Sequence, residues 1–187
     1  MTLWRIKAPF YSRIRRRPPF NLILQQERTQ LAKLLQQIAL PIVSHLDLGS
    51  GSGDTLALFS KYEIQVCADA SFAMLQQSPA TRKTLARAEC LPFADHSFDF
   101  VTAIGLLEYI ADAEKFLAEV SRVLKPGGMF LFTSAPPNAA NCMRLILGER
   151  LYYWREKEVT ILLHKSGWAI RGTARSWMQQ QWLAQAR

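Results

Sequence analysis

The sequence predicts an α/β fold built on a doubly wound, mostly parallel sheet of six to seven strands with helices on both faces. Three observations lead to this prediction. Short apolar runs alternate with segments of helical periodicity between about residues 42 and 135. The connections between these segments are short, as they are in successive β–α–β units. A glycine-rich stretch, "LDLGSGSGD", directly follows the first of the apolar runs.

Each expected strand is short and rich in β-branched or aromatic residues, and each expected helix gathers its apolar residues on one face. We expect strands at 42–48, 63–68, 84–88, 98–104, 129–135 and 168–176. We expect helices at 21–38, 54–61, 71–78, 112–124 and 155–167. Pro41 closes the first helix and "KPGG" the fourth. Residues 178–187 are polar and follow no turn signal, so the last expected edge is irregular or the sheet stops at six strands.

The chain has 187 residues, of which 49% are hydrophobic, and this is enough for one globular domain with its own core. We divide it into a basic N-terminal cap segment with its helix, 1–40, and a main domain, 41–187. No run of eighteen apolar residues is present, so we expect no membrane-spanning helix. The three cysteines show no C-x-x-C spacing. They argue against a disulfide framework or a metal site and favour a reducing, cytoplasmic location.

The net charge of +8 is concentrated toward the two ends of the chain. Residues 1–40 hold eight Lys or Arg and a single acid, Glu27. Within them, "WRIKAPFYSRIRRRPPF" mixes aromatic and basic residues. This segment could form a lid over an active site, contact an anionic membrane surface through residues 1–20, or be a solvated or targeting tail. It carries no base-reading motif, so no specific nucleic-acid partner is expected.

The glycine turn predicts a ligand site at the carboxyl end of the first strand, where ligands of doubly wound sheets bind. Gly49, Gly51 and Gly53 let the backbone approach a ligand closely, although a tight strand–helix turn would also explain them. The helix expected at 54–61 would point its free N–H groups at the same place. Asp69, twenty residues after Gly49, stands where an acid accepts hydrogen bonds from ribose hydroxyls. The G-x-G-x-G spacing differs from the G-x-G-x-x-G of pyrophosphate binders and favours a nucleoside without pyrophosphate.

Four motifs in order resemble class I S-adenosylmethionine-dependent methyltransferases: "LDLGSGSGD", "ADASFAML", "AECLPFADHSFDFVTAIGLLEYI" and "RVLKPGGMFLFTSAP". The resemblance covers about residues 43–135 and is greatest to the branch that contains ubiquinone- and menaquinone-biosynthesis enzymes and other small-molecule methyltransferases. It implies a Rossmann-like fold and S-adenosyl-L-methionine as cofactor. It also implies methyl transfer to a small-molecule or lipid-like acceptor by in-line displacement. A degenerate, cofactor-binding protein that acts through partners is the alternative, and a nicotinamide oxidoreductase is disfavoured by the glycine spacing.

The resemblance also implies roles for individual positions along the cofactor. The methionine part would be lined first by the glycine turn and then by the end of the fourth strand, the ribose by an acid, and the adenine by apolar and backbone groups. In that order the residues are Asp47, Gly49, Ser50, Gly51 and Gly53; Ile104 and Gly105; Asp69; and Ala70, Met74, Glu89 and Cys90. Acceptor contacts are expected from Tyr11, Glu108, Tyr109 and Tyr153.

Two positions near these motifs bear on the site without joining it. Arg87 stands where the family often has an acid that accepts from the adenine amino group, and an arginine can only donate. Asp99 matches the family pattern, but we expect it to order the entry of the fourth strand rather than bind a ligand. No histidine is a decisive general base: His45 and His164 are expected to pack or lie at the surface, and His96 to be solvated. The oligomeric state is not readable from the sequence.

Overall fold

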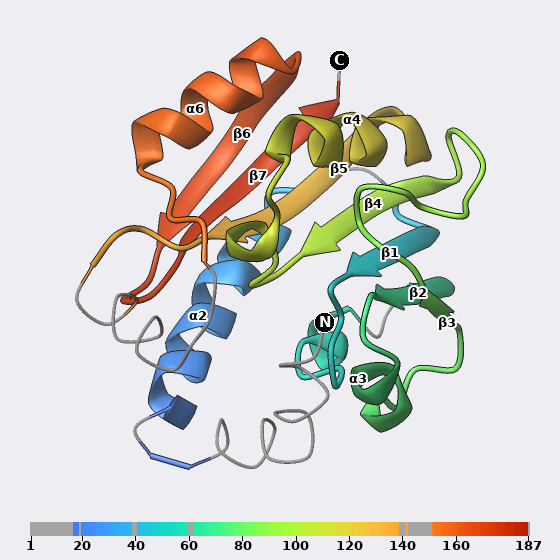
Figure 1. The fold of residues 1–187 in the computed structure, drawn as a ribbon, viewed down its shortest axis with the longest axis horizontal. Helices are drawn as coiled ribbons and strands as arrows, with labels where there is room; N and C mark the ends of the chain where they lie inside the picture. The colour runs from blue at the N-terminus through green and yellow to red at the C-terminus, as the bar shows by residue number, and fades with distance from the viewer. Residues whose placement is uncertain are drawn as a thin grey trace.

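Seven strands form one mixed sheet in the order β3-β2-β1-β4-β5-β7-β6 (Figure 1). The computed structural model describes residues 17–18, 20–38, 41–59, 62–138, 141 and 151–186. The strands are β1 Ser44–Leu48, β2 Ile64–Asp69, β3 Lys83–Leu85, β4 Phe98–Ala103, β5 Leu124–Ser134, β6 Trp168–Arg175 and β7 Gln180–Ala186. The helices are α2 Phe20–Leu35, α3 Phe72–Gln77, α4 Ala113–Val123 and α6 Glu156–Lys165, with short 3₁₀ helices η1 Leu56–Leu58 and η2 Leu107–Tyr109. The five strands β1 to β5 pair in parallel, and β7 is antiparallel to both of its neighbours.

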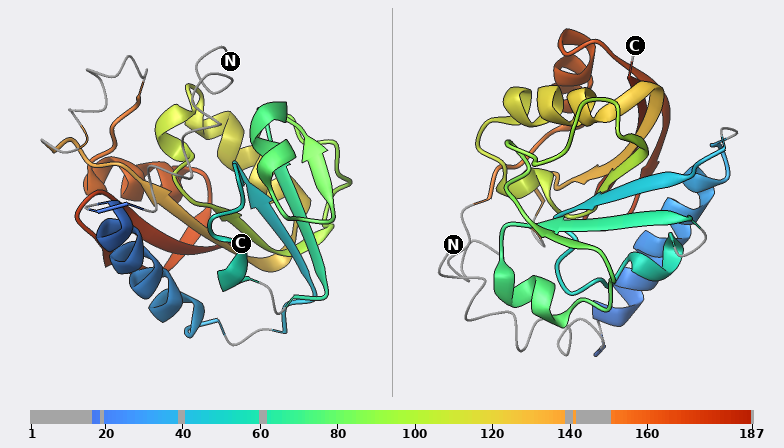
Figure 2. Two further views of the ribbon diagram at one scale, coloured as in Figure 1. Left: turned by 90° about the horizontal axis from the view of Figure 1, so that it is seen from below. Right: turned by 90° about the vertical axis from the view of Figure 1, so that its right-hand side faces the viewer.

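Helices cover both faces of the sheet and divide the apolar interior into two clusters (Figure 2). On one face, α4 and α6 pack over the sheet with Phe116, Leu163 and Trp168 fully buried. On the other face, Leu31 and Leu34 of α2 pack against Phe59, Phe100, Leu131 and Leu183. The predicted doubly wound α/β fold is therefore confirmed, and α2 belongs to one of its two layers. No helix within the described ranges is long and apolar enough to cross a membrane.

The prediction of a helix at 54–61 is wrong for the part of this range that the structure describes. Only the 3₁₀ turn η1 forms there, with Leu56 N–H bonded to the carbonyl of Gly53 and Phe59 N–H to that of Leu56. These i→i+3 bonds tighten the chain and bring Phe59 into full burial against the ring of His45 at 4.7 Å. The apolar spacing that suggested a helix instead serves a turn that inserts a ring into the core.

The last edge of the sheet is regular, contrary to the expectation of six strands or an irregular end. Residues 180–186 form β7, which lies between β5 and β6 rather than at the edge. Gln180 and Gln181 are buried, and Gln181 donates to the carbonyl of Glu27 on α2 at 3.2 Å. Trp182 donates its indole N–H to the hydroxyl of Ser134 at 3.0 Å. Because β5 and β6 supply the ladder, and α2 and β5 supply these partners, a polar sequence without turn signals becomes an internal strand.

Asp99 ties the amino ends of β1, β4 and β5 together, as the sequence suggested. Its carboxylate accepts hydrogen bonds from the N–H of Val43 at 3.2 Å, from the N–H and hydroxyl of Ser44 at 2.8 Å each, and from the Lys125 ammonium at 2.7 Å. Burial alone would raise the pKa of Asp99, but the bonds from Lys125, Ser44 and Val43 outweigh it and lower this pKa to about 2. The carboxylate is therefore a structural tie at the edge opposite the glycine turn.

Replacing Asp99 by Asn is expected to reduce the free energy of unfolding at pH 7 and to flatten its acid dependence. Because the folded-state pKa lies below the ordinary value of 3.8, this stabilisation is present above about pH 4 and is lost as the pH falls toward 2. Urea denaturation at pH 7, 4 and 3 measures the difference. Glu63→Gln, at an exposed acid before β2, is the control. A wild-type–variant difference that does not shrink between pH 7 and 3 would contradict this account.

Candidate active site

The glycine turn at the end of β1 adopts a backbone conformation that only glycine readily allows. Gly49, Gly51 and Gly53 have φ values of 64°, 55° and 82°. A Cβ on Gly51 would stand 3.0 Å from the Cε of Met74, so the turn packs directly against that buried side chain. Figure 1 shows β1 and β4 ending at the middle of the molecule, where the turn lies. The structure thus brings Met74, predicted to border the adenine, together with the turn.

Asp69, at the end of β2, holds the glycine turn in place. One carboxylate oxygen accepts from the N–H of Gly51 at 2.9 Å and the other from the N–H of Ser71 at 2.7 Å. Each oxygen of a carboxylate has two lone pairs, so capacity remains for ribose hydroxyls. Burial raises the pKa of Asp69, and these two backbone bonds oppose the rise. The residue predicted to bind ribose therefore also shapes the turn, a second role that spacing alone did not indicate.

Asp47 is a buried carboxyl group on the α2 side of the sheet, two residues before the turn. It is 1% exposed, and its Oδ1 accepts from the hydroxyl of Thr102 on β4 at 2.7 Å. Its Oδ2 is buried and has no hydrogen-bond partner among the described residues. Burial raises its pKa to about 7; the Thr102 bond lowers the value and the nearby charge of Asp69 adds to the rise. A buried carboxyl oxygen without a partner is costly and is satisfied by a hydrogen-bond donor or a cation.

These features fit a cationic nucleoside and do not fit a pyrophosphate. The N–H groups of Gly49, Ser50, Gly51 and Gly53 all donate within the protein, to Ala68, Asp69 or the turn itself. The turn is followed by a single 3₁₀ turn rather than by a helix whose N-terminus would attract an anion. The carboxyl groups of Asp47 and Asp69 flank the same place and repel phosphate. The fold and this site together fit an α/β protein that binds a nucleoside without pyrophosphate.

The "LPF" segment, which directly follows the residues predicted to border the adenine, is clamped by α4. Arg122 donates to the carbonyls of Leu91 at 3.1 Å and Phe93 at 2.8 Å, while Glu119 accepts from the N–H of Leu91 at 2.7 Å. Arg122 and Glu119 also pair with each other at 2.8 Å. The bond from Arg122, joined by that from Leu91, lowers the pKa of Glu119 to about 2. Neither clamp residue was among the predicted site residues, because their role depends on a helix that is distant in sequence.

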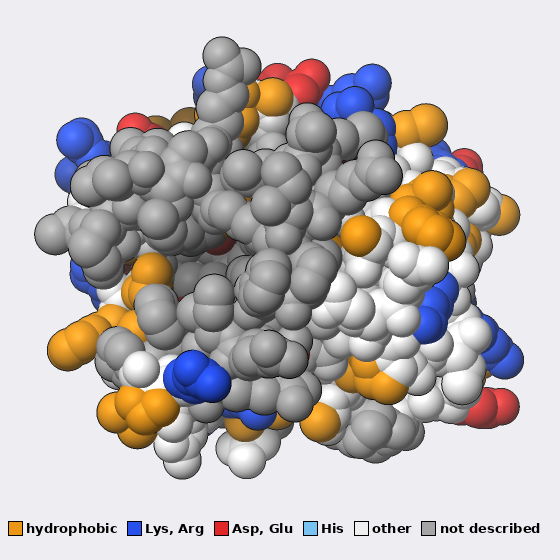
Figure 3. Space-filling model, turned by 60° about the horizontal axis from the view of Figure 1, so that its bottom comes forward, with side chains coloured by type: hydrophobic (Ala, Val, Ile, Leu, Met, Phe, Trp, Pro, Cys, Tyr) orange, Lys and Arg blue, Asp and Glu red, His pale blue; other side chains and the backbone are white. Residues whose placement is uncertain are grey.

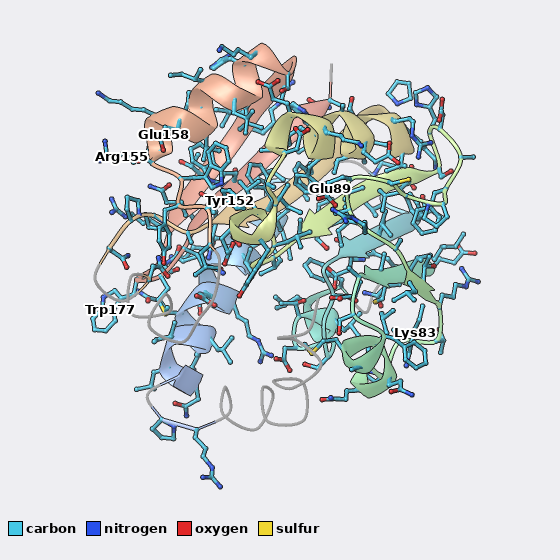
Figure 4. The ribbon with its side chains drawn as sticks, viewed as in Figure 1. Lys83, Glu89, Tyr152, Arg155, Glu158 and Trp177 are labelled. Atoms are coloured by element: carbon cyan, nitrogen blue, oxygen red, sulfur yellow. The ribbon has the colours of Figure 1, made fainter. Side chains whose placement is uncertain are left out.

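The side chain of Arg87 is largely exposed and pairs with that of Glu89. Their side chains approach to 3.3 Å, with Arg87 65% exposed and Glu89 15% exposed. Figure 4 shows Glu89 near the middle of the molecule, toward the carboxyl ends of the central strands. The backbone N–H of Cys90 donates to the carbonyl of Arg87. Cys90 and Ala70 are both exposed. Glu89, which the sequence predicted to border the adenine, is thus paired with the arginine.

The turn after β4 is held by two residues that the sequence reasoning missed. Gly105, with φ of 69°, donates its N–H to the hydroxyl of Thr133 on β5 at 2.7 Å. A Cβ on Gly105 would stand 3.4 Å from the side-chain nitrogen of Gln179, the residue before β7. Gln179 is 7% exposed, and its Oε1 has no partner among the described residues. The "QQQ" run could have suggested this amide only if β7 had been placed beside β5.

The predicted acceptor contacts are partly brought together. Glu108 is 1% exposed in η2, and its carbonyl accepts from the N–H of Tyr152 at 2.7 Å. The Tyr153 hydroxyl donates to the carbonyl of Asn141 at 2.6 Å, and Tyr109 is partly buried beside Glu108. Tyr11 lies outside the described residues. Ile104 is partly buried against the α2-side cluster, next to Gly105.

Comparison with known proteins gives the family of this chain. The sequence profile of a methyltransferase domain matches residues 46–132. A demethylmenaquinone methyltransferase from Thermus thermophilus is 34% identical over 160 residues, covering 79% of this chain and 70% of the relative. A ubiquinone/menaquinone biosynthesis C-methyltransferase from Klebsiella pneumoniae is 37% identical over 100 residues, covering 46% of this chain. The chain spans only 40% of the length of that second relative.

Solved structures share the whole fold. A magnesium protoporphyrin IX methyltransferase from Synechocystis, with bound S-adenosylhomocysteine, superposes with a TM-score of 0.75 at 17% identity, covering 100% of this chain and 99% of that one. An S-adenosylmethionine-dependent methyltransferase from Thermotoga maritima gives 0.77 at 16% identity, covering 98% and 99%. The chain belongs to the class I S-adenosylmethionine-dependent methyltransferase family, whose cofactor is S-adenosylmethionine.

Replacing Asp69 by Ala is expected to weaken binding of S-adenosylhomocysteine about tenfold or more, because one change removes the predicted ribose acceptor and the tie to Gly51. Isothermal titration calorimetry at pH 7.5 measures the affinity. Glu114→Ala, at an exposed position on α4, is the matched control and should bind like the wild type. An Asp69→Ala protein that is folded by circular dichroism and binds with unchanged affinity would remove Asp69 from the cofactor site.

Proposed function

We propose that this protein transfers a methyl group from S-adenosylmethionine to a small aromatic, quinone-like acceptor by in-line displacement. The observation that carries the proposal is the buried Asp47 carboxyl, whose Oδ2 lacks a partner among the described residues and lies beside a turn that is closed to phosphates. The cofactor, when bound, supplies an activated methyl group on a positively charged sulfur. The protein's task is then to hold that methyl group in line with the acceptor.

Each part of the site has a distinct role in this proposal. Asp47 Oδ2 accepts a hydrogen bond from the ammonium end of the cofactor, and the glycine turn lies along its methionine part. Asp69 accepts from the ribose hydroxyls with the lone pairs that Gly51 and Ser71 leave. Met74, which is 3% exposed, provides an apolar wall for the adenine, and Glu89 and the backbone of Cys90 face its polar edge.

The acceptor side lies beyond Gly105, between β4 and the start of β7. Gln179, just before β7, faces Gly105, and Glu108 follows on η2. In this proposal both side chains contact the acceptor. The relatives from Thermus and Klebsiella are named for menaquinone and ubiquinone biosynthesis. These names support an aromatic acceptor that carries hydroxyl or keto oxygens, which the Gln179 amide and the Glu108 carboxyl can hydrogen-bond.

We also propose that the protein contacts membranes peripherally, which would give it access to a lipid-like acceptor. Trp177, between β6 and β7, is 76% exposed, and its backbone N–H donates to the side-chain oxygen of Gln26 on α2 at 3.4 Å. Leu22, one turn before Gln26 on the same helix, is 63% exposed. Figure 4 shows Trp177 pointing away from the body of the protein, and Figure 3 shows hydrophobic side chains beside a Lys or Arg side chain at the lower left of its view. An exposed tryptophan suits the membrane–water interface, and the chain's net charge of +8 suits an anionic lipid surface.

The proposed activity predicts label transfer from S-adenosyl-[methyl-³H]methionine to 1,4-naphthohydroquinone. Calorimetry first compares S-adenosylmethionine, S-adenosylhomocysteine and NAD; we expect the first two to bind and NAD not to bind. Asp47→Ala should reduce transfer at least tenfold because a cationic group loses its carboxylate. Binding of both S-adenosyl compounds without transfer to naphthohydroquinone or related hydroxylated aromatics would favour the degenerate, partner-dependent protein. Binding of NAD alone would contradict the proposal.

Flotation with liposomes that contain 30% anionic phospholipid tests the membrane contact. We expect the full chain to float and Trp177→Ser to float severalfold less, since an exposed aromatic anchor is lost. Ile161→Ser on α6, which is 54% exposed, is the matched control and should float like the wild type. Recovery of the wild-type protein in the soluble fraction, with anionic as with neutral vesicles, would exclude the contact.

A further inference from the structure

A chain of hydrogen-bonded polar side chains, partly buried at Gln65 and buried beyond it, crosses three strands behind the glycine turn. The amide nitrogen of Gln65 on β2 lies 3.4 Å from Nδ1 of His45 on β1. The other ring nitrogen, Nε2, lies 2.9 Å from the hydroxyl oxygen of Thr102 on β4. That hydroxyl donates to Oδ1 of Asp47 at 2.7 Å. His45 and Thr102 are fully buried and Asp47 is 1% exposed, so water does not compete for these bonds.

The direction of every bond in this chain follows from the number of protons available. The Thr102 hydroxyl has one hydrogen, which it donates in the hydrogen bond to Asp47. Toward His45 it can therefore only accept a hydrogen bond. Nε2 of His45 must therefore carry a proton. Nδ1 is then the acceptor and faces the amide N–H of Gln65. The chain of donors runs in one direction, from Gln65 through His45 and Thr102 to the carboxyl group.

The imidazole is held as a neutral donor by its surroundings. Its ring contacts those of Phe59 at 4.7 Å, Phe100 at 5.2 Å and Tyr62 at 5.3 Å. Burial among these rings lowers the pKa of His45 to about 3, so the ring stays uncharged throughout the neutral range. It therefore adds no positive charge that would favour the ionised form of Asp47. Its contribution is a fixed N–H that polarises and orients the Thr102 hydroxyl.

The other groups that face Asp47 do not replace this contact. On β2, the Cys67 thiol is kept neutral because burial raises its pKa to about 12, and the Asp69 carboxylate repels a second negative charge. Lys83 on β3 acts on Cys67 rather than on Asp47. Among the described residues, the Thr102 hydroxyl is therefore the group that favours the ionised form of Asp47 and fixes which of its oxygens is left for a ligand.

We propose that His45 is a positioning residue for cofactor binding: through Thr102 it fixes the Asp47 carboxyl so that Oδ2 faces the ammonium end of the cofactor. This inference rests on the proposed role of Asp47. A cationic group binds the ionised carboxyl, so affinity rises with pH across the range in which Asp47 loses its proton. Removing the relay makes that proton harder to lose, and the rise in affinity moves to higher pH.

The test measures binding of S-adenosylhomocysteine by calorimetry from pH 5.5 to 8.5. For the wild type we expect affinity to increase at least tenfold over this range, with its midpoint near pH 7. Thr102→Val and His45→Phe, which keep shape but remove the donors, should move the midpoint up by about one pH unit. Thr102→Ser and His45→Gln, which keep a neutral donor, should restore it. Thr160→Val, whose hydroxyl bonds within α6, should behave as the wild type.

The outcomes separate a positioning role from packing and from the proposed function. A loss of affinity that is equal at all pH values, or a midpoint that Thr102→Val leaves in place, would overturn the relay. Titration of the ¹³C-labelled Asp47 carboxyl in the ligand-free protein gives an independent reading. If the wild type binds no S-adenosylhomocysteine, the proposed function fails. The carboxyl titration of the wild type and of Thr102→Val then still decides whether the relay acts on Asp47.

Discussion

Two carboxyl groups, that of the buried Asp47 and that of the partly buried Asp69, lie close enough to repel each other at the carboxyl edge of the sheet, and the surrounding structure compensates for this. Removing an ionised group from water costs several kcal/mol unless hydrogen bonds or opposite charge compensate. Asp69 is compensated by two backbone N–H groups. Asp47 is compensated on one oxygen only. This asymmetry leaves a local demand for a donor or a cation, and it is the physical basis of the site.

Around the site, side chains of one strand or helix hold the loop that follows another strand. Thr133 on β5 holds the turn after β4, and Asp69 on β2 holds the turn after β1. Arg122 and Glu119 on α4 hold the loop after β3 through its carbonyls and N–H. A nucleoside is recognised along a length greater than one turn can provide. The separate loops must therefore keep a common arrangement, and the parallel strands supply it.

The kind of ligand that the site fits follows from which backbone N–H groups of the glycine turn are free to bind one. In dinucleotide binders, N–H groups at a glycine turn and at a helix N-terminus face the pyrophosphate. Here the N–H groups of the turn are engaged within the protein, and a 3₁₀ turn stands in place of the helix. The sequence had suggested free helical N–H groups at this point. Their absence from the described turn strengthens the distinction that the G-x-G-x-G spacing first indicated.

The sequence by itself determined the alternation of strands and helices, the place of the glycine turn, and the acid at the end of β2, because apolar periodicity and glycine conformation are local properties. It did not determine β7, whose glutamines are stabilised as a strand by β5, β6 and the carbonyl of Glu27. Nor did it indicate that Thr102, 55 residues away, would bond to Asp47, or that His45 would stand behind it. Those contacts arise between strands brought together by the sheet order, and only the tertiary structure decides which side chains share a face. The residue types of the site could thus be predicted from the sequence, while the hydrogen bonds that orient their side chains could not.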